Sequence, residues 1–172
     1  MERYESLTQI LTRARDLDRD IRFINGEKDE VVMPYRTVWD RAVSLLAALQ
    51  AQGMREGDEL VIFTRSNEQF VIAFWAAILG GIIPVPVAVG ISDEHRFKLF
   101  RILTQLHKGT LFTEDELLER LTTFADKHDV ADVKAILRER AVTSIEFDGD
   151  ESADPVEPDP SAIAFIQYSS GS

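Results

Sequence analysis

The sequence contains no cysteine in 172 residues, which excludes disulfide bonds, thiolate catalysis and cysteine-ligated metal. It is also poor in bases: 19 Lys and Arg stand against 30 Asp and Glu, and the formal net charge is -11 at pH 7. A chain of this charge lacks the broad basic surface that nucleic acids and anionic membranes bind. The N-terminus carries no apolar signal core, and we expect a cytoplasmic protein.

One long uncharged run has the length of a membrane span. Residues 70–89 contain no charged side chain, and about 20 apolar residues cross a bilayer. However, Gly80-Gly81 predicts the end of a helix, and Pro84 and Pro86 break any helix that continues. The run therefore predicts a buried helix followed by a buried strand, with no membrane span.

Helical and strand patterns alternate along most of the chain. Apolar spacing of three and four residues predicts helices, and short apolar runs predict strands. The expected helices cover residues 7–17, 35–52, 67–79, 92–106, 114–124 and 130–140; the expected strands cover residues 60–63, 82–87, 110–112, 143–147 and 162–168. Residues 21–24 and 31–33 flank a turn and predict a small hairpin near the N-terminus. This order indicates an α/β fold with a mostly parallel sheet flanked by helices.

Hydroxyl residues ahead of three expected helices predict N-caps. Ser66 with Gln69 and Thr113 with Glu116 match the capping-box spacing, and Ser92 can cap a third helix. Residues 148–160 hold three of the six prolines and six acidic residues, which predicts an acidic proline-rich loop in solvent.

The chain ends in Ser169-Ser170-Gly171-Ser172 directly after an apolar run. Glycine lets the backbone approach an anion, and amides and hydroxyls can donate to it. The tetrapeptide alone is weak evidence for a phosphate site, because such sequences are common in linkers. The motifs G-x-x-x-x-G-K-[ST] and G-x-G-x-x-G are both absent, and the latter absence disfavours a dehydrogenase domain.

Three stretches resemble the adenylate-forming superfamily of acyl-CoA synthetases, luciferases and peptide-synthetase adenylation domains. Residues 164–172, Ala-Phe-Ile-Gln-Tyr-Ser-Ser-Gly-Ser, are similar to its strand and the first half of its phosphate loop, which continues as Thr-Gly-x-Pro-Lys-Gly. Residues 34–58 resemble its first helix and "G-v-x-x-G-D" turn, although Pro34 replaces a frequent hydroxyl cap. Residues 70–86 resemble its "A-x-x-x-G-a-x-x-v-P" passage. Residues 1–172 are thus identified as a truncated N-terminal segment of an AMP-binding (adenylation) domain.

The resemblance is strongest to fatty-acyl-AMP ligases and to loading modules of polyketide and nonribosomal peptide synthetases. It implies that a carboxylic acid, with a fatty acid favoured, attacks ATP to form an acyl-adenylate. The acyl group then passes to the thiol of coenzyme A or of a carrier protein's phosphopantetheine. ATP and Mg²⁺ are the implied cofactors, with Ser169, Ser170, Gly171 and Ser172 as phosphate ligands. We expect no catalytic residue and no metal ligand within the segment, which alone should be inactive and self-associate.

The alternative is a free-standing α/β binding module without catalysis. The remaining candidate residues favour structural roles: His95, His107 and His128 lack metal-ligand spacing. The acids Asp115, Glu116 and Glu119 fall in the first turns of a helix, where they suit the helix dipole.

Two further groups of residues have functional alternatives. Phe74 and Trp75 could line an acyl tunnel, but a buried helix favours a core role. The small basic group Arg96, Lys98 and Arg101 predicts a solvated surface.

Overall fold

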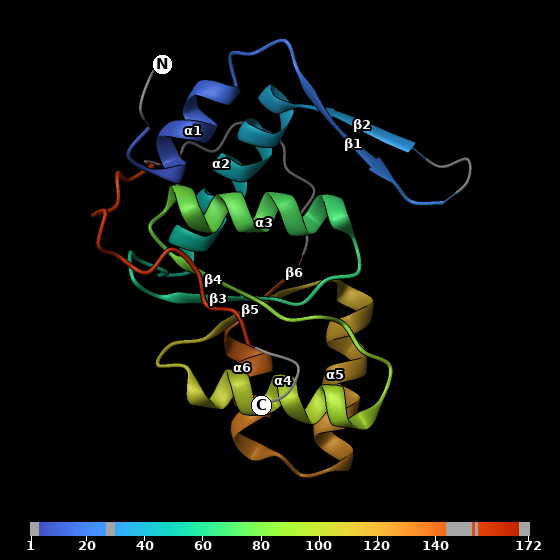
Figure 1. The fold of residues 1–172 in the computed structure, drawn as a ribbon. Helices are drawn as coiled ribbons and strands as arrows, with labels where there is room; N and C mark the ends of the chain where they lie inside the picture. The colour runs from blue at the N-terminus through green and yellow to red at the C-terminus, as the bar shows by residue number, and fades with distance from the viewer. Residues whose placement is uncertain (1–3, 27–29, 144–152, 154, 169–172) are drawn as a thin grey trace.

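Four short parallel strands form a sheet at the centre of the molecule (Figure 1). The computed structural model describes residues 4–26, 30–143, 153 and 155–168. The strands are β3 (Glu59–Ile62), β4 (Ile83–Pro86), β5 (Thr110–Thr113) and β6 (Ala141–Thr143), in the order β4-β3-β5-β6. The predicted α/β class with a parallel sheet is confirmed.

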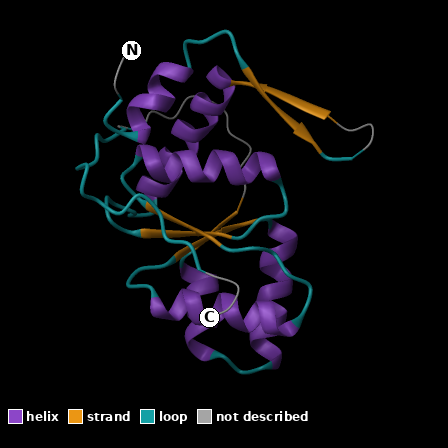
Figure 2. Ribbon diagram, viewed as in Figure 1, coloured by secondary structure: helices purple, strands orange, loops and turns teal. Residues whose placement is uncertain are grey.

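Helices cover both faces of the sheet and complete a three-layer arrangement (Figure 2). On one face lie α1 (Leu7–Ala14), α2 (Tyr35–Ala51) and α3 (Asn67–Leu79); on the other lie α4 (Asp93–Gln105), α5 (Asp115–Lys127) and α6 (Ala131–Glu139). Strand side chains alternate between the two cores: Leu60 and Ile62 pack with the first three helices, whereas Val61 packs with the last three. Burial on both faces explains why the strands are continuous apolar runs.

The predicted hairpin is present and projects from the layer of α1–α3 (Figure 1). Strand β1 (Asp20–Ile24) pairs antiparallel with β2 (Glu30–Pro34). Phe23 and Met33 anchor it in the first core, but Ile24 is 74% exposed. Residues 27–29, within the connection between the strands, lie outside the described residues.

Helix α3 begins and ends where the sequence predicts. The Ser66 side chain accepts a hydrogen bond from the Gln69 backbone N–H at 3.1 Å, and Gly80 caps the other end. The reciprocal half of the capping box is absent, because the buried Gln69 side-chain oxygen has no partner among the described residues. The next residue, Gly81, has φ +63°, a conformation that glycine adopts at little cost.

The other two predicted caps differ from the structure. Thr113 is the fully buried last residue of β5 and pairs in register with Thr143, so the predicted Thr113–Glu116 capping box is wrong. Glu114 takes the N-cap position of α5 instead. Ser92 does occupy the N-cap of α4, but its hydroxyl bonds the His95 Nδ1 atom at 2.5 Å rather than a backbone amide.

The predicted strand over residues 162–168 is also wrong: the segment runs beside β4 but forms only one backbone hydrogen bond with it, from Ile166 N–H to the Pro84 carbonyl at 3.0 Å. The amides of Ile83 and Val87 point toward β3, where they donate to Asp58 and Ile62. The backbone polar groups of the even-numbered residues of β4, Pro84 and Pro86, therefore face away from β3. At these two positions proline has no N–H to donate. This edge cannot support a regular ladder.

Two smaller predictions fall partly outside the described residues. Within residues 148–160 the described positions form a loop, and the Val156 N–H donates to the Leu79 carbonyl at 2.8 Å. The predicted strand at residues 143–147 overlaps β6 only at Thr143, and residues 144–147 lie outside the described part.

Candidate functional site

The carboxyl ends of the central strands create a natural binding crevice. Strands β3 and β5 are neighbours, but the helices that follow them, α3 and α5, lie on opposite faces of the sheet (Figure 1). The two connections therefore lead away from the sheet on opposite faces. In open parallel sheets, ligands bind at such switch points.

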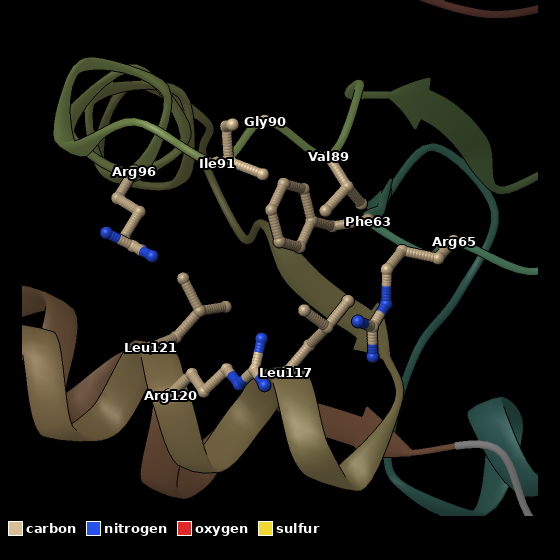
Figure 3. A pocket seen from close by; sticks show the side chains of 9 residues that line it. All are labelled: Phe63, Arg65, Val89, Gly90, Ile91, Arg96, Leu117, Arg120 and Leu121. Carbon is tan, nitrogen blue, oxygen red and sulfur yellow. The ribbon is translucent and has the colours of Figure 1, made fainter.

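A cavity of about 240 Å³ lies at this edge (Figure 3). Its lining comes from the loop after β3, the loop after β4, helix α4 and helix α5: Phe63, Arg65, Val89, Gly90, Ile91, Arg96, Leu117, Arg120 and Leu121. We call this cavity the tri-arginine pocket. Phe63, Leu117 and Leu121 give it an apolar wall, while the three guanidinium groups come from three separate segments (Figure 3).

Glu116 joins two of these arginines through a single carboxylate. Its Oε2 atom lies 2.7 Å from Arg65 Nη2, and its Oε1 atom lies 2.6 Å from Arg120 Nη2. The hydrogen bond from Arg65 is the main reason that the pKa of Glu116 lies below its ordinary value. The same bond raises the pKa of Arg65. Glu116 also lies in the first turn of α5, as the sequence predicts, so the ion pairs add to its favourable position at the helix N-terminus.

Arg96 reaches the pocket from the first turn of α4. Its guanidinium pairs with Asp93 at 2.6 Å and lies 5.1 Å from the centre of the Phe124 ring. The Arg96 side chain is only 28% exposed, so the predicted solvated role is wrong for this residue. Stacking on an aromatic ring fixes the guanidinium plane.

Hydrogen bonds to Glu114 hold the loop after β3 against the start of α5. One carboxylate oxygen, Oε1, accepts from the Thr64 hydroxyl at 2.6 Å, the Arg65 N–H at 2.8 Å and the Ser66 N–H at 3.3 Å. Hydrogen bonds to an ionised acceptor are stronger than those between neutral groups. The backbone of Arg65 is therefore held independently of its side chain.

The pocket can bind an anionic group that carries an apolar part. Three guanidinium groups line the pocket. Glu116 and Asp93 form ion pairs with them, and the charge of Glu114 also acts on Arg65. Guanidinium groups form paired hydrogen bonds with phosphate and carboxylate oxygens, and the apolar wall suits an attached hydrocarbon or ring.

The residues predicted as phosphate ligands, Ser169, Ser170, Gly171 and Ser172, lie outside the described residues. The segment that leads to them is described. Ile166 bonds Pro84, and Tyr168 lines a hollow with Pro86 and Val87. The segment thus advances in the same direction as β4, and Tyr168 lies at the carboxyl edge of the sheet.

The other candidates take structural positions. Phe74 and Trp75 are partly buried and pack against the first core, while the His128 ring packs on Phe124 with centroids 4.3 Å apart. In the described ranges no group of three or more His, Asp or Glu side chains could hold a metal ion. Nor does any described helix have the length and apolarity to cross a membrane.

Sequence reasoning missed Arg65, Arg120 and Glu114. Arg65 and Glu114 each follow the carboxyl end of a predicted buried strand, and that placement could have drawn attention to them. Arg120 carries no comparable signal, because a helix surface is the commonest place for an arginine.

Comparisons with known proteins identify related sequences. The family model described as "AMP-binding enzyme" matches residues 12–172. The long-chain-fatty-acid–AMP ligase FadD32 of Mycolicibacterium smegmatis is 27% identical over 158 residues, which cover 88% of this chain and 24% of that protein. The chain thus spans about a quarter of the length of the curated relatives it matches.

Solved structures share the fold. The adenylation domain of a keto acid-selecting nonribosomal peptide synthetase module, bound to keto acyl adenylate, has a TM-score of 0.83 at 24% identity and covers 98% of this chain and 32% of its own. A fatty acid AMP ligase from Legionella pneumophila has a TM-score of 0.80 at 21% identity, with 98% and 28% covered. With the family model matched along most of its length, the chain belongs to the AMP-binding enzyme family.

Proposed function

We propose that the full-length protein is an AMP-forming acyl ligase that activates a carboxylic acid with ATP. The family match over residues 12–172 carries this proposal. Relatives named as fatty-acid–AMP ligases and adenylyltransferases support the adenylation step. A fatty acid is the favoured substrate, because the relative FadD32 is named for long-chain fatty acids. A loading module of a polyketide or peptide synthetase, working in the cytoplasm, is a setting that fits this chemistry.

In this proposal Ser169, Ser170, Gly171 and Ser172 bind the β- and γ-phosphates of ATP. Their amides and hydroxyls supply donors, and Mg²⁺ shares the phosphate charge when it is bound. The placement of Tyr168 at the carboxyl edge supports this assignment, since ligands of open parallel sheets bind outside that edge. The described residues contribute the rigid sheet from which such a loop departs.

We propose that the thiol acceptor of the second half-reaction contacts the tri-arginine pocket through its phosphate. Coenzyme A and the phosphopantetheine arm of a carrier protein both carry phosphate, and guanidinium groups recognise phosphate well. The pocket combines Arg65, Arg96 and Arg120 with an apolar wall. The pocket is the feature of the described structure best suited to the phosphate of either acceptor.

Pyrophosphate exchange tests the adenylation proposal. The full-length protein should exchange labelled pyrophosphate into ATP when a fatty acid is supplied, and a panel of fatty, keto and amino acids should rank the substrates. The 172-residue chain alone should give only background exchange. Absence of exchange in the full-length protein with every acid in the panel would favour the free-standing binding module. A coding sequence that continues past Ser172 as Thr-Gly-x-Pro-Lys-Gly would favour the enzyme.

A further inference from the structure

We infer that Glu116 is an internal counter-anion of the tri-arginine pocket, which an incoming phosphate must displace from Arg65 and Arg120. This inference rests on the phosphate-bearing ligand proposed above for the pocket. It makes Glu116 a residue that sets the affinity of the site without being a ligand of the phosphate itself.

The geometry supports the substitution of one anion for another. The two oxygens of the Glu116 carboxylate each pair with a different guanidinium, at 2.7 Å from Arg65 and 2.6 Å from Arg120. A phosphate presents oxygens with the same hydrogen-bonding capacity and one more negative charge. Both arginines line the pocket wall (Figure 3), so a phosphate inside the pocket competes with Glu116 for the same two guanidinium groups.

The Glu116 contacts are exposed enough to be exchanged. Its side chain is 55% exposed, and those of Arg65 and Arg120 are 49% and 59% exposed. Water screens such pairs, which are individually weak. A phosphate that takes paired hydrogen bonds from the same guanidinium groups can replace them.

The fold does not depend on these ion pairs. The backbone amides of Arg65 and Ser66 are held by Glu114, not by Glu116. Leu117 and Leu121 bury the inner side of α5 in the second core. The guanidinium of Arg65 can therefore leave Glu116 while its loop and helix α5 remain in place.

Glu119 provides a matched control on the same helix. Glu116 and Glu119 both line a second hollow beside the pocket, but among the described residues Glu119 has no ion pair with an arginine of the pocket. Changing either glutamate to glutamine removes one negative charge and keeps the side-chain size. A general charge effect should tighten phosphate binding in both variants. Release of an internal competitor should tighten it only in Glu116→Gln.

A titration with inorganic phosphate tests the inference on the 172-residue chain. Two-dimensional NMR would follow the side-chain Nε–H signals of Arg65 and Arg120 in the wild type, Glu116→Gln and Glu119→Gln. The Glu116→Gln variant should bind phosphate about two- to tenfold more tightly, the size expected when exposed ion pairs no longer compete. Glu119→Gln should bind within about twofold of the wild type.

Three results would overturn the inference: unchanged or weaker phosphate binding in Glu116→Gln, equal tightening in Glu119→Gln, or no phosphate binding by any of the three proteins. A Glu116→Asp variant, with a shorter carboxylate that reaches the arginines less well, should lie between wild type and Glu116→Gln and guards against a folding defect in the latter. Because the titration involves no ATP or acid, its failure is distinguishable from a failure of pyrophosphate exchange in the full-length protein.

Discussion

The carboxylate of Glu114 accepts a hydrogen bond from the backbone N–H of Arg65 at 2.8 Å, across 49 residues of sequence. The bond joins the loop after β3 to Glu114, the residue just before α5. The helices that follow, α3 and α5, lie on opposite faces of the sheet. The bond thus joins the two connections at the point where the chain topology switches from one face of the sheet to the other. The position of the Arg65 backbone therefore depends on a residue that follows another strand, β5.

Replacing Glu114 should loosen this loop. Glu114→Ala removes an acceptor shared by Thr64, Arg65 and Ser66, and we expect the free energy of unfolding to fall by about 2 kcal/mol. Amide hydrogen exchange should accelerate at Arg65 and Ser66. Glu119→Ala, a solvent-side change on the same helix, should alter stability by less than about 0.5 kcal/mol. Unchanged exchange at both amides would show that Glu114 does not hold the loop.

The Glu116 ion pairs predict a dependence of stability on pH. The pKa of Glu116 is lowered from its ordinary value of 4.5 by Arg65 and Arg120, so the ionised form stabilises the folded state. This contribution should be complete above the unfolded pKa and be lost as the pH falls through the lower, folded pKa. Urea unfolding of the wild type and Glu116→Gln, compared from about pH 6 to about pH 2, measures it. The difference in unfolding free energy between the two proteins should shrink as the pH falls. A difference that stays constant with pH would contradict the ion pairs of Glu116.

Gly81 should tolerate a side chain poorly. It has φ +63°, and an added Cβ would lie 2.8 Å from Glu56 Cγ and 3.0 Å from Val156 Cγ2. Gly53 has φ +93° but open space around its Cα, so Gly53→Ala measures the backbone cost alone. We expect Gly53→Ala to lose about 1 kcal/mol of unfolding free energy, and Gly81→Ala to lose about 1–2 kcal/mol more. If urea unfolding gave equal losses of unfolding free energy for the two variants, the side chains of Glu56 and Val156 would move aside freely.

The serines that end the chain should matter for adenylation. In the full-length protein, Ser170→Ala or Ser172→Ala should slow the first half-reaction by an amount equivalent to about 2–4 kcal/mol, the usual cost of losing a preorganised donor. Acyl transfer from preformed acyl-adenylate should be affected less. Pyrophosphate exchange and single-turnover transfer separate the two steps. If neither step changes in either variant, these hydroxyls do not bind phosphate.

The sequence predicted the framework of the fold well because its signals are local. The apolar run at Leu60–Phe63 and the Gly80-Gly81 helix end each reflect a property of neighbouring residues, and the structure confirms both. The strand at residues 162–168 failed for a different reason. Its own residues are suitable, but the partner edge carries Pro84 and Pro86, and strand formation depends on both partners.

The candidate site could be predicted only in part. The resemblance pointed to Ser169–Ser172, whose ligand role remains a prediction. The tri-arginine pocket was not predicted, because Arg65, Arg96 and Arg120 lie on three segments that only the topology brings together. No spacing along the chain reveals that convergence.

The last prediction concerns association of the 172-residue chain. Ile163 and Phe165 are 61% and 48% exposed on the extended segment beside β4, and Phe165 packs on Phe74 with centroids 6.3 Å apart. Exposed apolar side chains that lie together promote association. The β4 edge itself offers little for strand pairing, since Pro84 and Pro86 face outward without N–H groups. Association should therefore depend on these side chains rather than on backbone pairing.

Light scattering against protein concentration tests this view. The apparent mass of the wild-type chain should rise with concentration, and Phe165→Asp should reduce that rise. Phe97→Asp is the matched control, because Phe97 is 39% exposed but belongs to the helix layer on the opposite face of the sheet from Phe74. A wild-type chain that stays monomeric at all concentrations would refute the prediction. Equal effects of the two substitutions would instead assign association to general apolarity, because a specific surface must respond to its own residues and not to a distant one.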